Sequence, residues 1–490
     1  MNSFLTKLRK LNIELTVVES KLKINAPKGV LTKEILAEIQ ENKVAIISYL
    51  EGIRSSQKKY ETIGKAIQKD SYPLSPAQQR LYFLYQFDKK STVYNISFAY
   101  LVKGPIDIGK LTDAFNSLID RHEILRTSFQ LIDEDVRQIV HEKISCEVEI
   151  ISKGEESQSQ LNATFIQPFD LSIAPLVRIG VVEIKKDENI LIFDIHHIIF
   201  DGISQEVFVK EFMSLYEGEK LSPVPLQYKD YIEWLETAGQ QSAIQRQRAF
   251  WLDNFIDIPP KADLPSDYER PAVKKFTGDV ISLNLDKEET RRLEELAKKA
   301  GVTLNVILFS VYHILLRKLT QQKDIVIGTP VAGRPHPDLS NLMGVFINML
   351  PIRLSLEDDL SIKACISQIK AKFLKALDNQ SFQFEELINE LQVERDSSRN
   401  PLFDFMFAFQ NFERPKVELP GLTLEPYPLQ NKVSRFDLTL WTYKKGEEIN
   451  LSFEYSTELF QRDTILRYGN YFKRILRLAQ ENWDTKIAEI

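Results

Sequence analysis

The feature that most constrains this 490-residue chain is an apolar, β-rich stretch that leads directly into a polar cluster. Residues 190–195 read Ile-Leu-Ile-Phe-Asp-Ile, and the chain continues as His196-His197-Ile198-Ile199-Phe200-Asp201-Gly202. A short run of β-branched and aromatic residues predicts a buried strand, and an Asp-Gly pair predicts a turn at its end. The sequence therefore predicts a strand whose end presents two imidazoles and a carboxylate.

These residue types fit the transfer of an acyl group to an amine. A histidine can accept a proton from the attacking nitrogen, and Gly202 allows close backbone approach where an oxyanion forms. Because side chains alternate along a strand, His196 and His197 face opposite ways, so only one is expected to be the direct catalyst. Asp201 either holds an imidazole through an ion pair or accepts backbone hydrogen bonds. The alternative is two packed strand histidines before an ordinary turn.

Composition narrows the class of protein. Residues 1–60 hold 11 Lys and Arg against 6 Asp and Glu, whereas the whole chain has a net charge of −6, so the body is acidic. An acidic body argues against nucleic acid as a partner. Cys146 and Cys365 match no metal or disulfide spacing, so no metal site is expected. The chain lacks an apolar stretch of the roughly 18 residues that span a bilayer, and lacks a signal peptide, so we expect a cytoplasmic protein with no membrane partner.

Proline spacing and charge divide the chain into five segments. We expect a small α/β head at 1–58, a linker at 59–71, a first lobe at 72–255, an inter-lobe linker at 256–275 and a second lobe at 276–490. In the head, apolar spacing predicts a helix at 4–11, strands at 13–18 and 21–24, and two helices after Thr32.

Strands and helices alternate through both lobes, which predicts an α/β (α+β) fold. Ser75 and Pro76 are typical of a helix start, as are Asp286 and Glu289 three residues later. The pattern predicts helices at 77–87, 108–121, 230–234, 244–255, 287–301 and 304–319, and strands at 98–102 and 325–328.

Further stretches, in order, resemble the motifs of condensation domains of nonribosomal peptide synthetases, whose active-site signature is written HHxxxDG. Besides the run at 196–202, the stretches that resemble these motifs are Ser75–Leu84, Arg121–Phe129, Tyr228–Trp234, Ile327–Arg334 continuing to Asn348, Glu385–Leu387 and Arg395–Asp404. Together they cover most of the chain after the head, which makes a chance match to the short signature negligible.

The resemblance implies a V-shaped pseudodimer of two lobes, each similar to chloramphenicol acetyltransferase, with the signature in a tunnel between them. Donor and acceptor carrier proteins would bring thioester substrates on phosphopantetheine arms, and no cofactor would be bound by the chain itself. The product would be a peptide bond between a donor acyl or peptidyl group and an acceptor aminoacyl group. If the chain is a fragment, an adenylation domain would follow in cis.

The resemblance also implies roles for individual residues. His197 would be the catalytic histidine, supported by His196, Asp201 and Gly202. Asp201 would pair with Arg334 and so connect the lobes. Structural support would come from Arg80 and Arg126, and Ser75 and Asn348 would lie at the substrate tunnel.

The head resembles a TubC-type N-terminal docking domain in its order of helix, hairpin, Ala26-Pro27-Lys28-Gly29 and two helices. Its hairpin would then add the C-terminal linear motif of an upstream synthetase subunit as a further strand. Lys21, Lys23 and Lys28 would meet acidic residues of that motif. The alternative is that these lysines only keep the hairpin soluble.

Several functional alternatives stay open within and beyond this family. An epimerization domain shares the fold and signature, although the stretch Arg121-His122-Glu123 looks more like a condensation domain. Within condensation domains, Glu123 and the residues after Gly202 look like the type that accepts an L-configured donor and an L-configured acceptor. The other candidates are a noncatalytic docking or recruitment platform and a free-standing acyltransferase.

Overall fold

The computed structural model describes two strands near the start of the chain and most of the remainder. The described ranges are 14–18, 21–25, 62–152, 164–394, 396–410, 417–419, 421–429 and 432–490. The chain forms two compact units, Met1–Gly64 and Lys65–Ile490, and each is described by itself.

In the first unit, β1 (Glu14–Val18) and β2 (Lys21–Asn25) form an antiparallel hairpin. This confirms the hairpin expected in the head. Lys21 and Lys23 belong to β2, whereas Lys28 and the helices expected around the hairpin lie outside the described residues.

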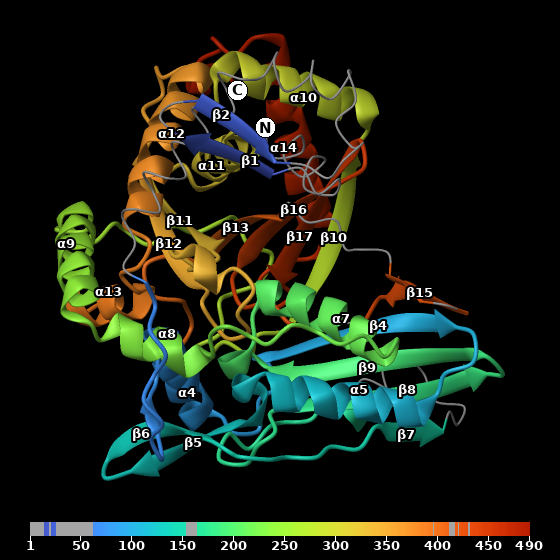
Figure 1. Ribbon diagram of the computed structural model, residues 1–490. Coiled ribbons are helices and arrows are strands. Elements are labelled where there is room, and N and C mark those ends of the chain that lie inside the picture. Colours follow the sequence, from blue (N-terminus) through green and yellow to red (C-terminus); the bar gives the residue numbers. More distant parts are fainter. Residues whose placement is uncertain are drawn as a thin grey trace. The chain divides into compact units, whose positions relative to one another are not determined.

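The first lobe of the second unit is built on a six-stranded mixed sheet with the order β14-β15-β4-β9-β8-β7 (Figure 1). Its strands are β4 (Asn95–Lys103), β7 (Glu149–Ser152), β8 (Val177–Lys185), β9 (Glu188–His196), β14 (Val417–Leu419) and β15 (Leu422–Tyr427). Residues 190–196 of β9 are all buried, as the apolar run predicts. A smaller sheet is formed by β3 (Tyr72–Pro73), β5 (Thr127–Ile132) and β6 (Asp135–Val140).

Helices of this part of the chain begin at or before their predicted starts, and one of them, which begins at Gly202, was not predicted. They are α4 (Pro76–Phe87), α5 (Ile108–Arg121), α7 (Gly202–Tyr216), α8 (Tyr228–Leu235) and α9 (Ala238–Asn254). Ser75 forms a capping box with Gln78 at the start of α4, with Pro76 in the first turn. Helix α7 packs on β9 through Phe208, whose ring meets that of Phe193 edge-on at 5.3 Å. This contact packs the middle of α7 on β9, and the short connection of residues 197–201 keeps the start of α7 near the end of β9.

The second lobe repeats the layered design around a sheet with the order β10-β17-β16-β13-β11-β12. Its strands are β10 (Gly278–Leu285), β11 (Asp324–Val331), β12 (Asn348–Ser355), β13 (Phe405–Gln410), β16 (Leu438–Lys445) and β17 (Glu448–Ser456). Its helices are α10 (Lys287–Ala300), α11 (Leu304–Thr320), α12 (Ile362–Asp378), α13 (Phe384–Glu390) and α14 (Arg462–Glu481). The capping box of Asp286 with Glu289 and the left-handed Gly301 confirm the expected limits of α10.

Two long-range contacts differ from the expected lobe boundaries. Strand β15 pairs with β4, so residues 417–427 complete the sheet of the first lobe although they follow most of the second lobe in sequence. Trp251 and Phe255, expected in the first lobe, and Leu264 of the expected linker all lie in the core of the second lobe, so that lobe begins earlier than expected. Sequence patterns predict local elements, but an edge strand gains its partner only when distant segments meet.

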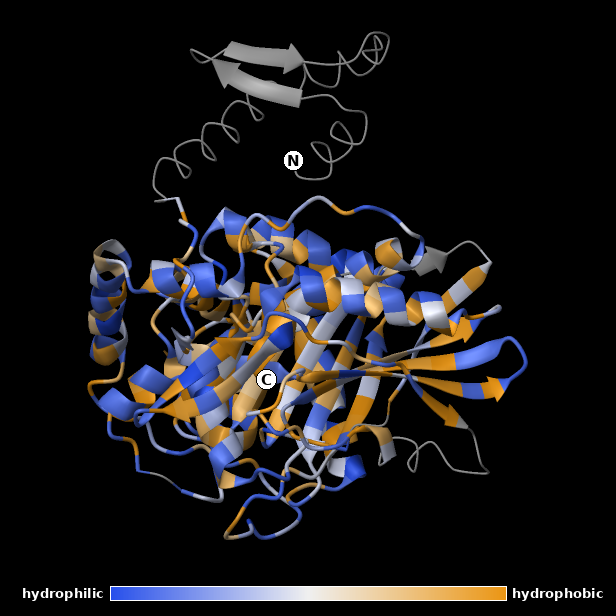
Figure 2. Cartoon of the chain, turned by 60° about the horizontal axis from the view of Figure 1, so that its bottom comes forward, coloured by the Kyte–Doolittle hydropathy of each residue, from blue (hydrophilic) through white to orange (hydrophobic). Residues whose placement is uncertain are grey.

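Figure 2 shows hydrophilic and hydrophobic residues alternating along the surface helices, as in amphipathic helices that cover a core. Of the helices in the described ranges, none is by itself long and apolar enough to cross a membrane. Helices α10 and α11 meet that criterion only as a pair, bent by 99° at the break between them.

Candidate active site

The polar run lies at the end of β9, where the two histidines leave the strand. His196 is the register partner of Asn95 on β4, and the His197 amide donates to the Tyr94 carbonyl oxygen at 2.8 Å. A single 3-10 turn, η2 (His197–Ile199), follows. The backbone of both histidines is therefore held by the neighbouring strand segment.

The expected turn at Asp201-Gly202 is wrong, because this pair begins a helix. Asp201 is the N-cap of α7, and its Oδ1 accepts a hydrogen bond from the Ser204 amide at 2.8 Å. An aspartate side chain at this position satisfies an amide that the first helical turn leaves free. Gly202 becomes the first residue of the helix and is exposed.

His197 is partly exposed and has a defined tautomer. Its Nδ1 lies 2.7 Å from the Phe200 carbonyl oxygen, which can only accept, so Nδ1 carries the proton and Nε2 keeps its lone pair. Burial and the positive charge of Arg435 lower the pKa of His197 to about 4. The imidazole is therefore neutral near pH 7, with a free acceptor nitrogen.

His196 has a structural position. Its side chain is buried, and its Nδ1 accepts the Ile198 amide at 3.1 Å, which caps the η2 turn. Burial, followed by the charge of His197, lowers the pKa of His196 to about 3. Of the two histidines, His197 is the one with solvent access.

Asp201 and Arg334 form a buried ion pair between the lobes. Arg334 Nη2 lies 2.9 Å from Oδ1 and 3.1 Å from Oδ2 of Asp201, and both side chains are 4 % exposed. Arg334 Nη1 donates to the carbonyl oxygens of Leu339 and Leu342, and its guanidinium lies over the Phe346 ring. The pairing that the family resemblance implied is present. Asp201 also accepts backbone hydrogen bonds from the Ser204 and Phe346 amides, so this alternative is confirmed, whereas its carboxylate pairs with Arg334 and not with an imidazole.

Two further residues, for which the sequence predicts no individual role, lie around this ion pair. Ser204 Oγ donates to the Gly344 carbonyl oxygen and accepts the Gly344 amide, at 2.8 and 3.0 Å. Tyr228, whose hydroxyl is 2.9 Å from Ser75 Oγ, donates to the Val345 carbonyl oxygen at 2.5 Å. Both join the first lobe to the 344–345 segment, a role that only contacts between distant segments reveal.

The other predicted residues have structural partners. Arg80 pairs with Glu385 of α13 at 2.8 Å. Arg126 donates to the carbonyl oxygens of Ile119, Asp120 and His141. These positions agree with the supporting roles expected for both arginines.

Asn348 and Ser75, which the resemblance placed at the substrate tunnel, both use their polar side-chain atoms in contacts within the protein. Asn348 is 1 % exposed, and its amide group is saturated by the Gln380 and Phe382 carbonyl oxygens and the Met349 and Phe384 amides. Ser75 lines a cavity, but its hydroxyl is used by Gln78 and Tyr228. Saturated side chains hold backbone segments and have no capacity left for a substrate.

Two cavities flank the junction of the lobes. The first, of about 290 Å³, is lined by residues of α4, α8, α9 and α13 together with Gly333 and Pro335. The second, of about 270 Å³, is lined by Asn95 and residues 97–100 of β4, by Gln205 of α7 and by residues 426–429. His197 lines neither cavity. In Figure 1 the elements of the first cavity lie at the left and those of the second at the right. Among the described residues, no cluster of side chains is arranged to hold a metal ion.

Buried neutral histidines make stability depend on pH. Burial lowers the pKa of His313, on α11, to about 4, and His196 titrates lower still. Such a group binds its proton more readily in the unfolded chain, so stability present above pH 6.5 is lost as the pH falls toward the folded pKa. Asp194 opposes this in part, because burial raises its pKa to about 6.

We expect the free energy of unfolding to fall between pH 7 and pH 5, by about 2 kcal/mol for each buried histidine before the Asp194 contribution is subtracted. Urea denaturation at the two pH values measures the fall. In His313→Leu the fall should be smaller by about 2 kcal/mol. An equal fall in both proteins would contradict the assignment to His313.

Comparison with known proteins agrees with this geometry. A family model for the condensation domain matches residues 68–490, and one for the TubC N-terminal docking domain matches residues 1–51. The chain is 39 % identical to tyrocidine synthase 3 of Brevibacillus parabrevis over 89 % of its length, and 38 % identical to bacitracin synthase 3 of Bacillus licheniformis over 96 %. It spans only 7 % and 8 % of those two proteins.

Solved structures show the same fold at lower identity. A four-domain nonribosomal peptide synthetase bound to AMP and glycine aligns with a TM-score of 0.78 and 22 % identity, over 87 % of this chain and 34 % of the other. The X-domain from teicoplanin biosynthesis aligns with a TM-score of 0.80 and 23 % identity, over 88 % and 99 %. The two-lobed fold class is thereby confirmed. The chain belongs to the condensation domain family of nonribosomal peptide synthetases and carries a TubC-type docking domain at its start.

Proposed function

We propose that the chain forms peptide bonds between a donor acyl or peptidyl thioester and an acceptor aminoacyl thioester, both held on carrier proteins. The observation that carries this proposal is the neutral, partly exposed His197 at the junction of the lobes, with its Nε2 lone pair free and its Nδ1 proton held by Phe200. This nitrogen can accept a hydrogen bond from an attacking amine.

The proposed reaction needs no redox partner or further co-reactant. The acceptor nitrogen attacks the donor carbonyl carbon, a C–N bond forms, and the C–S bond to the donor arm breaks. The attacking nitrogen loses one proton and the departing thiolate gains one, so atoms and charge balance. A neutral α-amine already exists in part near pH 7, since its usual pKa is about 8. His197 then acts first by orienting that amine.

Two tethered substrates need two approaches to one site. The two cavities lie on different sides of the molecule, which favours two separate approaches, although His197 lines neither cavity. One involves α4 and α13, and the other involves β4 and Gln205, one turn into α7. Each substrate would arrive on the phosphopantetheine arm of a carrier protein, with Gly202 leaving room for the thioester. The proposed reaction uses no cofactor bound by the chain itself.

The docking domain supports a place directly after another synthetase subunit, whose C-terminal linear motif would pair with the β1–β2 hairpin through Lys21, Lys23 and Lys28. The remaining parts of the proposal are an L-configured donor and acceptor, a cytoplasmic location and an adenylation domain following in cis. The relatives, antibiotic synthetases much longer than this chain, motivate the last of these.

The proposal is tested by loading donor and acceptor carriers with defined aminoacyl groups and detecting the condensed thioester by intact-protein mass spectrometry. We expect product on the acceptor carrier with an L-donor and less with its D-isomer. Equal turnover of a free amine would indicate a free-standing acyltransferase. Inversion of the carried residue without condensation would indicate an epimerization domain.

A recruitment role is the second candidate, because the fold is shared with the X-domain from teicoplanin biosynthesis, which has been solved in complex with OxyB. Absence of any condensed or inverted product with loaded carriers would favour this role. The intact run at 196–202 favours catalysis.

Gly202→Ala separates access to the site from folding. A Cβ built on Gly202 meets no atom within 4 Å among the described residues, and the first position of a helix tolerates alanine. We therefore expect an unchanged melting temperature. The rate of condensation should fall by about tenfold or more, because the added methyl group would displace the thioester by about 1 Å. Thermal denaturation and the carrier assay measure the two effects. Full activity would mean that no substrate approaches Gly202 closely.

A further inference from the structure

Arg435 is a partly buried cation that forms no ion pair within 4 Å among the described residues. It precedes β16, and its Nη2 donates to the Val93 carbonyl oxygen at 2.5 Å while its guanidinium lies 4.9 Å from the centre of the Tyr94 ring. Within the described ranges, no carboxylate lies at ion-pair distance from Arg435, although the more distant Glu454 contributes favourably to its charge. A cation is rarely left unpaired at such a position without a reason.

The contacts of Arg435 reach the backbone that holds the catalytic histidine. Val93 and Tyr94 lead into β4 in the first lobe, and the Tyr94 carbonyl oxygen accepts the His197 amide. Arg435 comes from the second lobe, so it joins the lobes on the β4 side of the run. Arg334 joins them on the Asp201 side.

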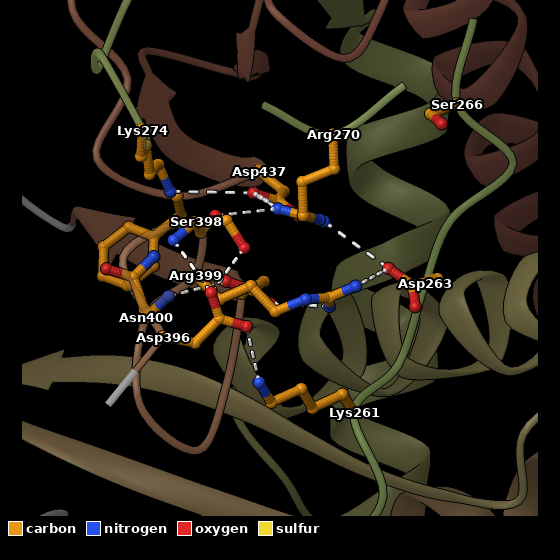
Figure 3. A network of polar contacts seen from close by, with 12 residues as sticks. Lys261, Asp263, Ser266, Arg270, Lys274, Asp396, Ser398, Arg399, Asn400 and Asp437 are labelled. Carbon is orange, nitrogen blue, oxygen red and sulfur yellow. Dashed lines mark hydrogen bonds and ion pairs between the residues drawn. The ribbon is translucent and has the colours of Figure 1, made fainter. Parts of the chain in front are cut away.

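A network of polar contacts holds the backbone of Arg435 itself. Lys274 Nζ and Asn400 Nδ2 both donate to the Arg435 carbonyl oxygen, at 2.9 and 3.0 Å. Figure 3 shows these two donors within a larger cluster, in which Asp437 receives hydrogen bonds from Arg270 and lies 3.6 Å from Lys274. Two independent donors to one carbonyl oxygen leave little freedom to the residue that carries it.

The cluster extends to the 396–404 loop. Asp404 Oδ1 accepts the Asn400 amide at 3.0 Å, and Asp404 Oδ2 accepts from Arg399 at 3.2 Å. The loop and the 270–274 segment therefore meet at the 434–437 segment.

The charge of Arg435 acts on both histidines. It is the largest influence after burial on the pKa of His197, which it lowers, and it also lowers the pKa of His196. The other groups that face the His197 imidazole are the Phe200 carbonyl oxygen and Asp201, and both act in the opposite direction. Arg435 thus lowers the pKa of His197, whereas Asp201 raises it.

We propose that Arg435 is a positioning residue of the condensation site, a second clamp between the lobes that holds the backbone of His197 and presents a positive charge to its imidazole. This rests on the condensation function proposed above. A cation at this place disfavours an imidazolium, so His197 serves as a hydrogen-bond acceptor for the amine and does not store its proton. The proton lost by the nitrogen passes to the departing thiolate.

The test compares Arg435→Gln, which keeps a hydrogen-bond donor for Val93 but removes the charge, with Arg435→Lys, which keeps both. The control is Arg291→Gln on the exposed face of α10. The readout is the titration of His197 by NMR in the full chain labelled on its 6 histidines, assigned with His197→Gln. It needs no carrier protein, so its outcome is independent of whether the chain condenses thioesters.

We expect the midpoint of His197 to rise by about one pH unit in Arg435→Gln and to stay near the wild-type value in the lysine and control variants. The acid limb of the condensation rate should move to higher pH by the same amount. Asn400→Ala removes one donor to the Arg435 carbonyl oxygen but keeps the Arg435 charge, so it should raise the His197 midpoint by less than Arg435→Gln does. If Arg435→Gln does not fold, Asn400→Ala tests the proposal in its place. Wild-type midpoints in these variants would overturn the proposal.

Discussion

His197→Ala is expected to lower kcat for condensation by about 10²–10⁴-fold, the range typical of a lost group that positions or transfers a proton. The fall should appear in kcat and not in the KM of the donor carrier, because the side chain acts on the attacking amine. His197→Gln should retain more activity than His197→Ala, since its amide oxygen can accept a hydrogen bond but cannot take up a proton near neutral pH.

Single-turnover formation of the condensed thioester measures both variants. The matched control is His141→Gln, which should retain wild-type turnover. In the wild-type chain the His141 imidazole lies 2.9 Å from Ser128 Oγ. Equal losses in the glutamine and alanine variants would mean that His197 accepts a proton. Wild-type activity in the alanine variant would remove His197 from the reaction.

Arg334→Ala should lower the free energy of unfolding by about 3–5 kcal/mol, because it leaves the buried Asp201 carboxylate without its cation. The variant also frees the carbonyl oxygens of Leu339 and Leu342, which Arg334 Nη1 holds. Lysine cannot replace the arginine, since a single ammonium cannot reach both the carboxylate and these carbonyl oxygens in one plane.

Urea denaturation measures this loss, and Arg80→Ala is the control. The pair of Arg80 with Glu385 has both side chains 27 % exposed, so its removal should cost no more than about 1 kcal/mol. The double variant Asp201→Asn with Arg334→Met should cost less than the sum of the single changes. Additive losses would show that the two side chains do not stabilise each other.

Local signals in the sequence were sufficient for much of the framework. Ser75 with Pro76, and Asp286 with Glu289, mark the starts of α4 and α10, because a capping side chain acts on amides only a few residues away. Asp201 obeys the same rule and caps α7, although the Asp-Gly pair is also typical of the turn that the sequence predicts there.

The different roles of the two histidines depend on contacts that local sequence patterns do not reveal. Alternation along β9 suggested that only one of them could act, but it did not say which. The tautomer of His197 depends on the Phe200 carbonyl oxygen, and its lowered pKa depends on burial and on Arg435, far along the chain.

The amino-acid sequence alone specifies the alternating strands and helices, the buried strand that ends in two histidines, and the motifs of the family, since periodicity, caps and short motifs act over a few residues. Folding in three dimensions decides that β15 completes the first sheet, that Asp201 meets Arg334 across 133 residues, and that Arg435 faces the histidines. Such pairings form only when segments far apart in the sequence bury their surfaces against one another. The free energy gained by this burial arises from the assembled core, so no single segment can specify it.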